Sequence, residues 1–161
     1  MKIGYFMDTY LPQVTGISYG LQNTISQLVS EGHELYLISP SPLSDSCGEK
    51  HPVPSFSLPF RDQKIGFASP NSVGDLDVVH VHQPYTIGLA GLYKARKEKV
   101  PLVYTFHTDH SSIISENTSS QLLGNLASRM FGSWEKIFLR RAEKIITPTN
   151  IVRKSYLSNF D

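Results

Sequence analysis

Residues 1–38 constrain the fold most, because they describe one strand–loop–helix–strand unit. Residues 3–7 are a short apolar run that ends in turn residues, which is typical of a buried strand in a parallel sheet. From Ile17 the apolar residues keep the spacing of one helix face, and Gly32 stands where a helix stops. A second strand pattern follows at 34–38. The right-handed crossover between such strands places the loop 8–16 at the carboxyl edge of the sheet, where anionic ligands bind.

The rest of the chain predicts further strands and helices in alternation. Residues 39–55 are rich in Pro, Ser, Gly and charge, which indicates a surface loop, and residues 54–60 alternate like a strand at a sheet edge. Further strands are expected at 76–82, 101–106 and 144–147, and helices from Thr86 to a basic last turn at 94–99, over 121–142 and over 150–160. This order predicts an α/β domain over residues 1–161 with a doubly wound, mostly parallel sheet.

Composition limits the partners of the chain. A formal net charge of +1 argues against a nucleic-acid binder, which normally carries a strongly basic face. A single cysteine, Cys47, excludes an internal disulfide and a cysteine-based zinc site. The N-terminus lacks the pattern of a signal peptide, and no apolar run approaches the roughly 20 residues that cross a bilayer. These features favour a cytoplasmic protein.

Polar residues follow three of the predicted strands, in the loops 8–16, 80–85 and 107–110. Because the carboxyl ends of parallel strands meet at one edge of a sheet, these three loops are expected to form one site. Gly16 belongs to no dinucleotide or Walker pattern. It permits either close approach of the backbone to a phosphate at a helix N-terminus or simply a tight turn into the helix.

The histidines of these loops leave alternatives open. His107 suits a hydrogen-bond donor or an acid–base group near neutral pH, or a structural histidine with its own partners. His80 and His82 stand two residues apart on a strand and therefore share a face. A metal pair would need a third ligand at a sensible spacing, so we expect no metal, with one histidine packed in the sheet and one lining its edge.

The helix predicted over residues 121–142 is amphipathic. Its apolar positions are Leu126, Met130, Trp134, Ile137, Phe138 and Ala142, and its basic positions are Arg129, Lys136, Arg140 and Arg141. Such a helix either packs its apolar stripe on the sheet or lies in a membrane surface with arginines among the head groups. The sequence leaves both arrangements open.

Several segments, in order along the chain, resemble glycosyltransferase family 4. The first is residues 6–17, Phe-Met-Asp-Thr-Tyr-Leu-Pro-Gln-Val-Thr-Gly-Ile, a strand leading into Asp-Thr, then Pro, then the glycine. The others are residues 32–35 with 39–40, 54–60, 77–82, 104–109 and the closing strand 144–149. Thr15 stands where the family commonly has Asn, and its β-branched side chain predicts a negative φ. The resemblance spans essentially the whole chain.

The resemblance implies the GT-B architecture, two Rossmann-like domains with the active site in the cleft between them. In that architecture residues 1–161 correspond to the N-terminal, acceptor-side domain, and the C-terminal domain that binds the nucleotide sugar is absent from this chain. The implied reaction transfers a hexose from a nucleotide diphosphate sugar with retention of anomeric configuration, and it requires no metal or other cofactor.

The resemblance also assigns roles to individual residues. His107 would lie beside the transferred sugar as the catalytic residue, and the backbone at Gly16 and Ile17 would contact the donor diphosphate. The acceptor side of the cleft would be lined by Asp8, Thr9, Tyr10, His82, Tyr85, Thr108, Asp109 and His110.

The likeness is strongest to lipid-directed members of the family. It favours UDP-glucose over GDP-mannose as the donor, a lipid or saccharide as the acceptor, and a membrane surface as a partner of the helix over 121–142. The alternative is a non-catalytic acceptor-binding or membrane-docking subunit that pairs with a separate donor-binding chain. A flavodoxin-like nucleotide module is disfavoured because the glycine fingerprint is missing.

Overall fold

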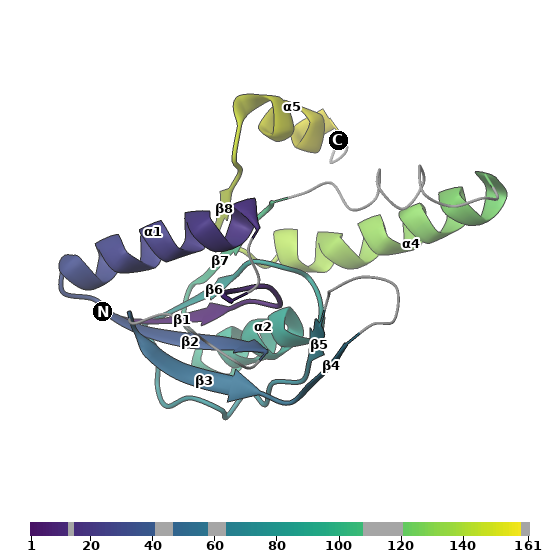
Figure 1. Ribbon diagram of the computed structural model, residues 1–161. Helices are drawn as coiled ribbons and strands as arrows, with labels where there is room; N and C mark the ends of the chain where they lie inside the picture. Colours follow the sequence, from purple (N-terminus) through teal and green to yellow (C-terminus); the bar gives the residue numbers. More distant parts are fainter. Residues whose placement is uncertain (13–14, 41–46, 58–63, 108–120, 159–161) are drawn as a thin grey trace.

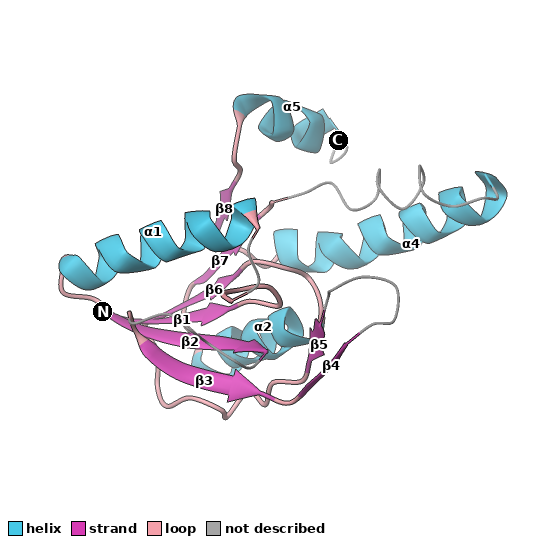
Figure 2. Cartoon of the chain, viewed as in Figure 1, coloured by secondary structure: helices cyan, strands magenta, loops and turns pink. Residues whose placement is uncertain are grey.

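A computed structural model describes residues 1–12, 15–40, 47–57, 64–107 and 121–158 (Figures 1 and 2). Within these residues one six-stranded sheet has the order β3-β2-β1-β6-β7-β8, and every pair of neighbours is parallel. The strands are β1 (Lys2–Phe6), β2 (Glu34–Pro40), β3 (Glu49–Val53), β6 (Val78–Val81), β7 (Leu102–Thr105) and β8 (Lys144–Ile146). The chain winds outward from β1 to β3, returns to β6 and winds outward to β8, so the doubly wound parallel sheet predicted from the sequence is confirmed.

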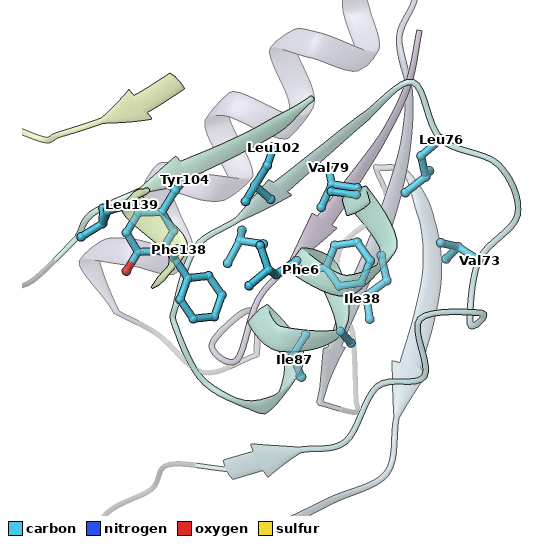
Figure 3. Close-up of a cluster of buried hydrophobic side chains, with 14 of the residues drawn as sticks. Phe6, Ile38, Val73, Leu76, Val79, Ile87, Leu102, Tyr104, Phe138 and Leu139 are labelled. Atoms are coloured by element: carbon cyan, nitrogen blue, oxygen red, sulfur yellow. The ribbon is translucent and has the colours of Figure 1, made fainter. Parts of the chain in front are cut away.

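The sheet carries an apolar core on each face, because alternate residues of β1 point to opposite sides. Ile3 and Tyr5 pack with Leu21 of helix α1 (Gly16–Ser30). Phe6 packs on the other side with Ile87 of helix α2 (Thr86–Glu98), in the cluster drawn in Figure 3. Helices α1 and α2 thus cover opposite faces, as Figure 1 shows, which leaves the carboxyl edge for a site.

Local sequence fixes both ends of α1. Thr15 is the N-cap residue with φ −140°, and its hydroxyl oxygen accepts a hydrogen bond from the Ser18 N–H at 3.1 Å. The negative φ expected for Thr15 is confirmed. At the other end Gly32 adopts φ +86° just after the helix, which a residue with a side chain rarely does. The helix stop predicted at this glycine is therefore confirmed.

The region between β2 and β6 differs from the expectation. The predicted loop 39–55 contains β3, which pairs with β2. It was missed because it is an edge strand whose sequence carries charges and Pro52, and proline is tolerated in such a strand. The edge strand predicted at 54–60 is β4 (Ser55–Ser57), which pairs antiparallel with β5 (Lys64–Gly66) in a separate two-stranded sheet. Residues 58–60 lie outside the described residues.

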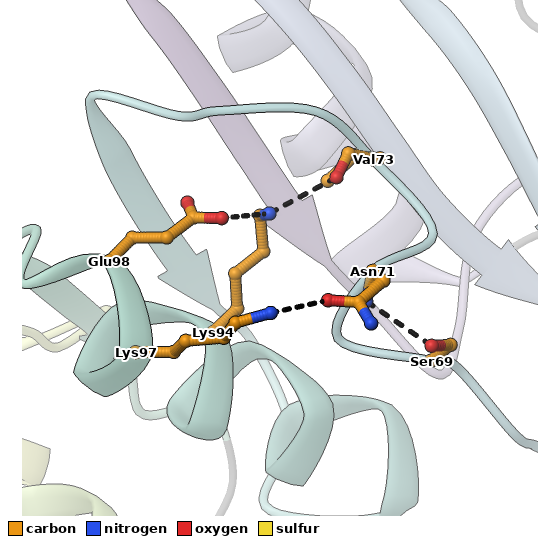
Figure 4. A network of polar contacts seen from close by, with 6 residues as sticks. All are labelled: Ser69, Asn71, Val73, Lys94, Lys97 and Glu98. Atoms are coloured by element: carbon orange, nitrogen blue, oxygen red, sulfur yellow. Dashed lines mark hydrogen bonds and ion pairs between the residues drawn. The ribbon is translucent and has the colours of Figure 1, made fainter.

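The basic last turn predicted for α2 is present, with Arg96 and Lys97, but Lys94 just before it is buried, with 1% of its surface exposed. Figure 4 shows its ammonium group donating to the Val73 carbonyl at 3.1 Å and to the Glu98 carboxylate at 2.6 Å. Lys97 alongside bonds Asn71 at 2.9 Å. Lys94 therefore ties the segment before β6 to α2.

Helix α4 (Gln121–Leu139) is held to the domain by the C-terminal half of the helix, and α5 (Asn150–Ser158) follows β8. Phe138 and Leu139 are buried in the core cluster that contains Tyr104, and the Tyr104 hydroxyl donates to the buried Glu135 carboxylate at 2.7 Å. Of the other apolar positions predicted for this helix, Ala142 is half-buried against the core, whereas Leu126, Met130, Trp134 and Ile137 are exposed. Leu122 and Leu123 are exposed as well. Of the two arrangements that the sequence left open, packing of the whole stripe on the sheet is therefore not the one observed.

Candidate functional site

Hydrogen bonds join the three polar loops at the carboxyl edge of the sheet. The Asp8 backbone N–H, after β1, donates to the Gln83 side-chain oxygen, after β6, at 2.9 Å. Nδ1 of His82, also after β6, lies 3.1 Å from Nε2 of His107, after β7. The convergence predicted from the sequence thus holds for β1, β6 and β7, at the point where the winding of the sheet reverses.

Asp8 is a buried carboxylate, and within the described residues no charged side chain compensates it. Its side chain is 5% exposed, and neither carboxylate oxygen has a hydrogen-bond partner of normal geometry within the described part of the chain. Burial raises the pKa of Asp8 to about 7, while the backbone N–H of Ile87, in the first turn of α2, lowers it by less. Asp8 is therefore poised to hold or release a proton near neutral pH.

Two further histidines pack behind His107. The ring centroids of His80 and His82 lie 4.0 Å apart. The His82 ring stacks on Tyr5 at 4.9 Å, and the His80 ring lies 4.7 Å from Tyr5 in a tilted arrangement. Nε2 of His80 lies 2.7 Å from the Thr105 hydroxyl. Burial lowers the pKa of His80 to about 3 and that of His82 well below its usual range, so both rings are neutral.

The shared face predicted for His80 and His82 is confirmed, but neither side chain lines the edge, because both are buried. His107 is half-buried and lies in front of His82. Nowhere in the described ranges are three or more His, Cys, Asp or Glu side chains grouped as a metal site requires.

The N-terminus of α1 offers an open stretch of backbone. Gly16 is exposed, and a Cβ atom added there would meet nothing within 4 Å. Ile17 beside it is half-buried. Because the first N–H groups of a helix have no partner within the helix, this is where a phosphate oxygen is favoured.

The other residues predicted to line the site differ in how deeply they are buried. Tyr10 is buried in the core under α1, Thr9 is half-buried, and the half-buried Tyr85 lies 6.1 Å from the Phe131 ring of α4. Residues Thr108, Asp109 and His110 lie outside the described residues. The structure thus brings Asp8, His82 and His107 together at the carboxyl ends of β1, β6 and β7, with His82 buried behind His107.

Sequence reasoning missed two residues that support this edge. Gln83 links the first two loops, and the Trp134 indole N–H of α4 donates to the Pro84 carbonyl at 2.6 Å. The available signal for Gln83 was an amide directly after an apolar strand and before a proline, where a buried polar side chain needs a partner. Nothing in the sequence indicates the partner of Trp134, since it lies 50 residues away.

Residues 14–161 match the model of a protein family described as Glycosyltransferase Family 4. The chain is 32% identical to an alpha-monoglucosyldiacylglycerol synthase of Acholeplasma laidlawii, over 92% of this chain and 41% of that protein. It is 27% identical to the synthase of the same name from Streptococcus pneumoniae, over 95% of this chain and 36% of that protein.

A third relative is a GDP-mannose-dependent alpha-mannosyltransferase of Mycolicibacterium smegmatis, 29% identical over 92% of this chain and 42% of that protein. The chain therefore spans about two-fifths of the length of these relatives.

Proposed function

Because the chain belongs to glycosyltransferase family 4, we propose that residues 1–161 are the N-terminal, acceptor-side domain of an enzyme that glycosylates a lipid. The donor is a nucleotide diphosphate sugar, with UDP-glucose favoured over GDP-mannose, and the transfer retains the anomeric configuration. The remaining part of the nucleotide site comes from the C-terminal domain of the complete protein. Relatives named for a glucosyldiacylglycerol product and for GDP-mannose support both donor classes.

The observation that carries the proposal is the hydrogen-bonded edge formed by Asp8, Gln83, His82 and His107. A hydroxyl acceptor needs a group that takes up a proton near neutral pH, and the raised pKa of Asp8 suits that task. His107 is the half-buried member of the edge and is assigned to a hydrogen bond with the transferred sugar. The open N-terminus of α1 at Gly16 is assigned to the donor diphosphate, since helix N-termini favour anions.

A transfer assay on the complete protein tests this assignment. UDP-glucose, UDP-galactose and GDP-mannose are offered with diacylglycerol or phosphatidylinositol, and product is compared for the wild type, His107→Ala and His33→Ala. His33 is the matched control because it lies at the opposite edge of the sheet, between α1 and β2. We expect the wild type to form product with one donor. Turnover should fall by at least about 100-fold in His107→Ala, whereas His33→Ala should keep the turnover of the wild type.

Equal turnover in both variants would remove His107 from the site. Consumption of no donor would favour the non-catalytic docking subunit, which pairs with a separate donor-binding chain.

The exposed face of α4 supports a membrane surface as a partner. At 100° per residue, Leu122, Leu126, Met130, Trp134 and Ile137 fall within an arc of about 120°, opposite the buried Glu135 and Leu139. Leu122 is 79% and Met130 66% exposed. The basic side chains of this region suit anionic head groups. Among the described helices none is long and apolar enough to cross a bilayer, so the proposed contact is peripheral.

The single tryptophan of the chain reports on this contact. Vesicles that contain anionic lipid are expected to sediment the protein at low salt and to shift the Trp134 emission to shorter wavelength. Met130→Glu should abolish both effects, whereas Tyr93→Glu, at an exposed aromatic residue of α2, should change neither. If vesicles of every composition leave the protein in the supernatant, the membrane assignment is wrong.

A further inference from the structure

We propose that His82 is a positioning residue for His107, donating the hydrogen bond that joins the two rings and thereby placing the proton of His107 on Nδ1. The proposal concerns the tautomer of His107, and it rests on the proposed function only for the nature of the ligand that this ring meets.

The first step is the geometry of the pair. Nδ1 of His82 and Nε2 of His107 lie 3.1 Å apart, which is a hydrogen-bond distance. His82 is 4% exposed, its ring stacks on Tyr5 with 25° between the planes, and the His80 ring lies 4.0 Å away. A ring packed on two sides is held in one orientation, so Nδ1 stays directed at His107.

The second step is the proton between the two nitrogens. His82 is a neutral ring, since burial and the neighbouring His80 and His107 lower its pKa well below the usual range. It therefore carries one proton, on either Nδ1 or Nε2. Within the described part of the chain, Nε2 of His82 is buried without a hydrogen-bond partner.

A proton on Nε2 of His82 would leave a buried N–H group without an acceptor. Orphaned buried donors are rarer in proteins than unsatisfied acceptors. The proton therefore belongs on Nδ1, where it is donated to Nε2 of His107. The bare Nε2 of His82 is then the less costly unsatisfied atom.

The third step concerns His107. Because Nε2 of His107 accepts from His82, the neutral His107 ring carries its proton on Nδ1. In that form His107 offers an N–H donor, which suits an oxygen atom of a sugar hydroxyl group. His82 does not touch the ligand, and its effect on the reaction is transmitted through His107.

Long-range ¹H–¹⁵N spectra of histidine side chains in the 161-residue chain test the tautomer directly, because protonated and bare ring nitrogens have well-separated ¹⁵N shifts. The His107 signals are identified by their loss in His107→Gln. At pH 8 we expect a protonated Nδ1 and a bare Nε2 in both His82 and His107. A proton on Nε2 of His107 would overturn the proposal without any variant.

Matched variants separate positioning from packing. His82→Phe keeps an aromatic ring on Tyr5 but removes the donor, so the Nε2–H form of His107 should appear. His82→Asn places an amide N–H at the same point and should restore the Nδ1–H form. His80→Phe removes a buried ring nitrogen that bonds Thr105 and should leave the His107 tautomer unchanged. Should His82→Phe fail to fold, the wild-type and His82→Asn spectra still decide the question.

None of these spectra requires a donor sugar or an acceptor, so the result is independent of the proposed function. In the complete enzyme His82→Phe should lower turnover by about fivefold to tenfold, the effect of one neutral hydrogen bond, with partial recovery in His82→Asn. A tautomer change in His82→Phe without loss of turnover would support the positioning and refute the proposed contact of His107 with the sugar.

Discussion

Replacing Asp8 by Asn should stabilise the fold at pH 8 much more than at pH 5. The Asp8 carboxylate is buried without a hydrogen-bond partner of normal geometry in the described structure, so its charged form is disfavoured in the folded state. In the unfolded chain the group ionises with a pKa near 3.8, whereas the folded value is about 7. The folded state binds a proton that the unfolded state has released, so stability falls as the pH rises through this window.

The magnitude follows from the two pKa values. Each pH unit between 3.8 and 7 lowers the free energy of unfolding by about 1.4 kcal/mol. The accumulated penalty is then about 2 kcal/mol at pH 5 and about 4 kcal/mol at pH 8. Asparagine cannot ionise, so the advantage of Asp8→Asn over the wild type should grow by about 2–3 kcal/mol between these pH values.

Urea unfolding of the wild type and the variant at both pH values measures this difference. With a slope of about 2 kcal/mol per molar urea, the gap between the two midpoints should widen by about 1 M from pH 5 to pH 8. Asp75→Asn, at an exposed carboxylate, is the control and should shift the midpoint equally at both pH values. A gap for Asp8→Asn that stays constant, or is larger at pH 5, would refute the account of Asp8 as a destabilising buried charge.

Three further predictions test other parts of the structure. Gly88→Ala should lower the free energy of unfolding by about 3 kcal/mol, because the added Cβ would overlap the Gln83 carbonyl oxygen. Gly16→Ala, where the space is open, should change it by less than about 0.5 kcal/mol. Similar urea midpoints for the two variants would contradict the close packing at Gly88. Lys94→Met should destabilise by about 2 kcal/mol, since Val73 and Glu98 lose their donor, and an unchanged melting temperature would show that the buried contacts contribute nothing. The pKa of His80 is lowered from 6.5 to about 3, so the neutral ring contributes fully to the free energy of unfolding above pH 6.5, and this contribution is lost as the pH falls below 6.5. Between pH 8 and pH 5 the free energy of unfolding of His80→Phe, measured in urea, should therefore fall by about 2 kcal/mol less than that of the wild type. An equal change in the two proteins would argue against a buried neutral ring.

The sequence predicted the centre of the sheet well because central parallel strands are buried on both faces. Residues 3–6 and 78–81 are therefore almost continuously apolar, a pattern that surface segments do not share. The family resemblance drawn from segments such as residues 6–17 is confirmed by the family match over residues 14–161. The order of polar loops after these strands then sufficed to predict one site at their carboxyl ends.

Edges and partners could not be predicted in the same way. β3 pairs on one side only, so Lys50 and Pro52 are compatible with a strand although they resemble a loop. The bond between His82 and His107 depends on the register of β6 against β7, in which Val81 lies opposite Tyr104. Register across separate elements is not encoded in local periodicity. The roles assigned to the site residues remain predictions.

The central position of β1 has a consequence for synthesis of the chain. Ile3 pairs with Leu35 on one side and with Val78 on the other, so β1 is synthesised well before the second of its two neighbours, β6. At about 5–20 residues per second, this delay is about 4–15 s. During that time an apolar strand presents an unpaired edge. Nascent-chain chaperones that shield such edges are therefore expected to raise the yield of folded protein.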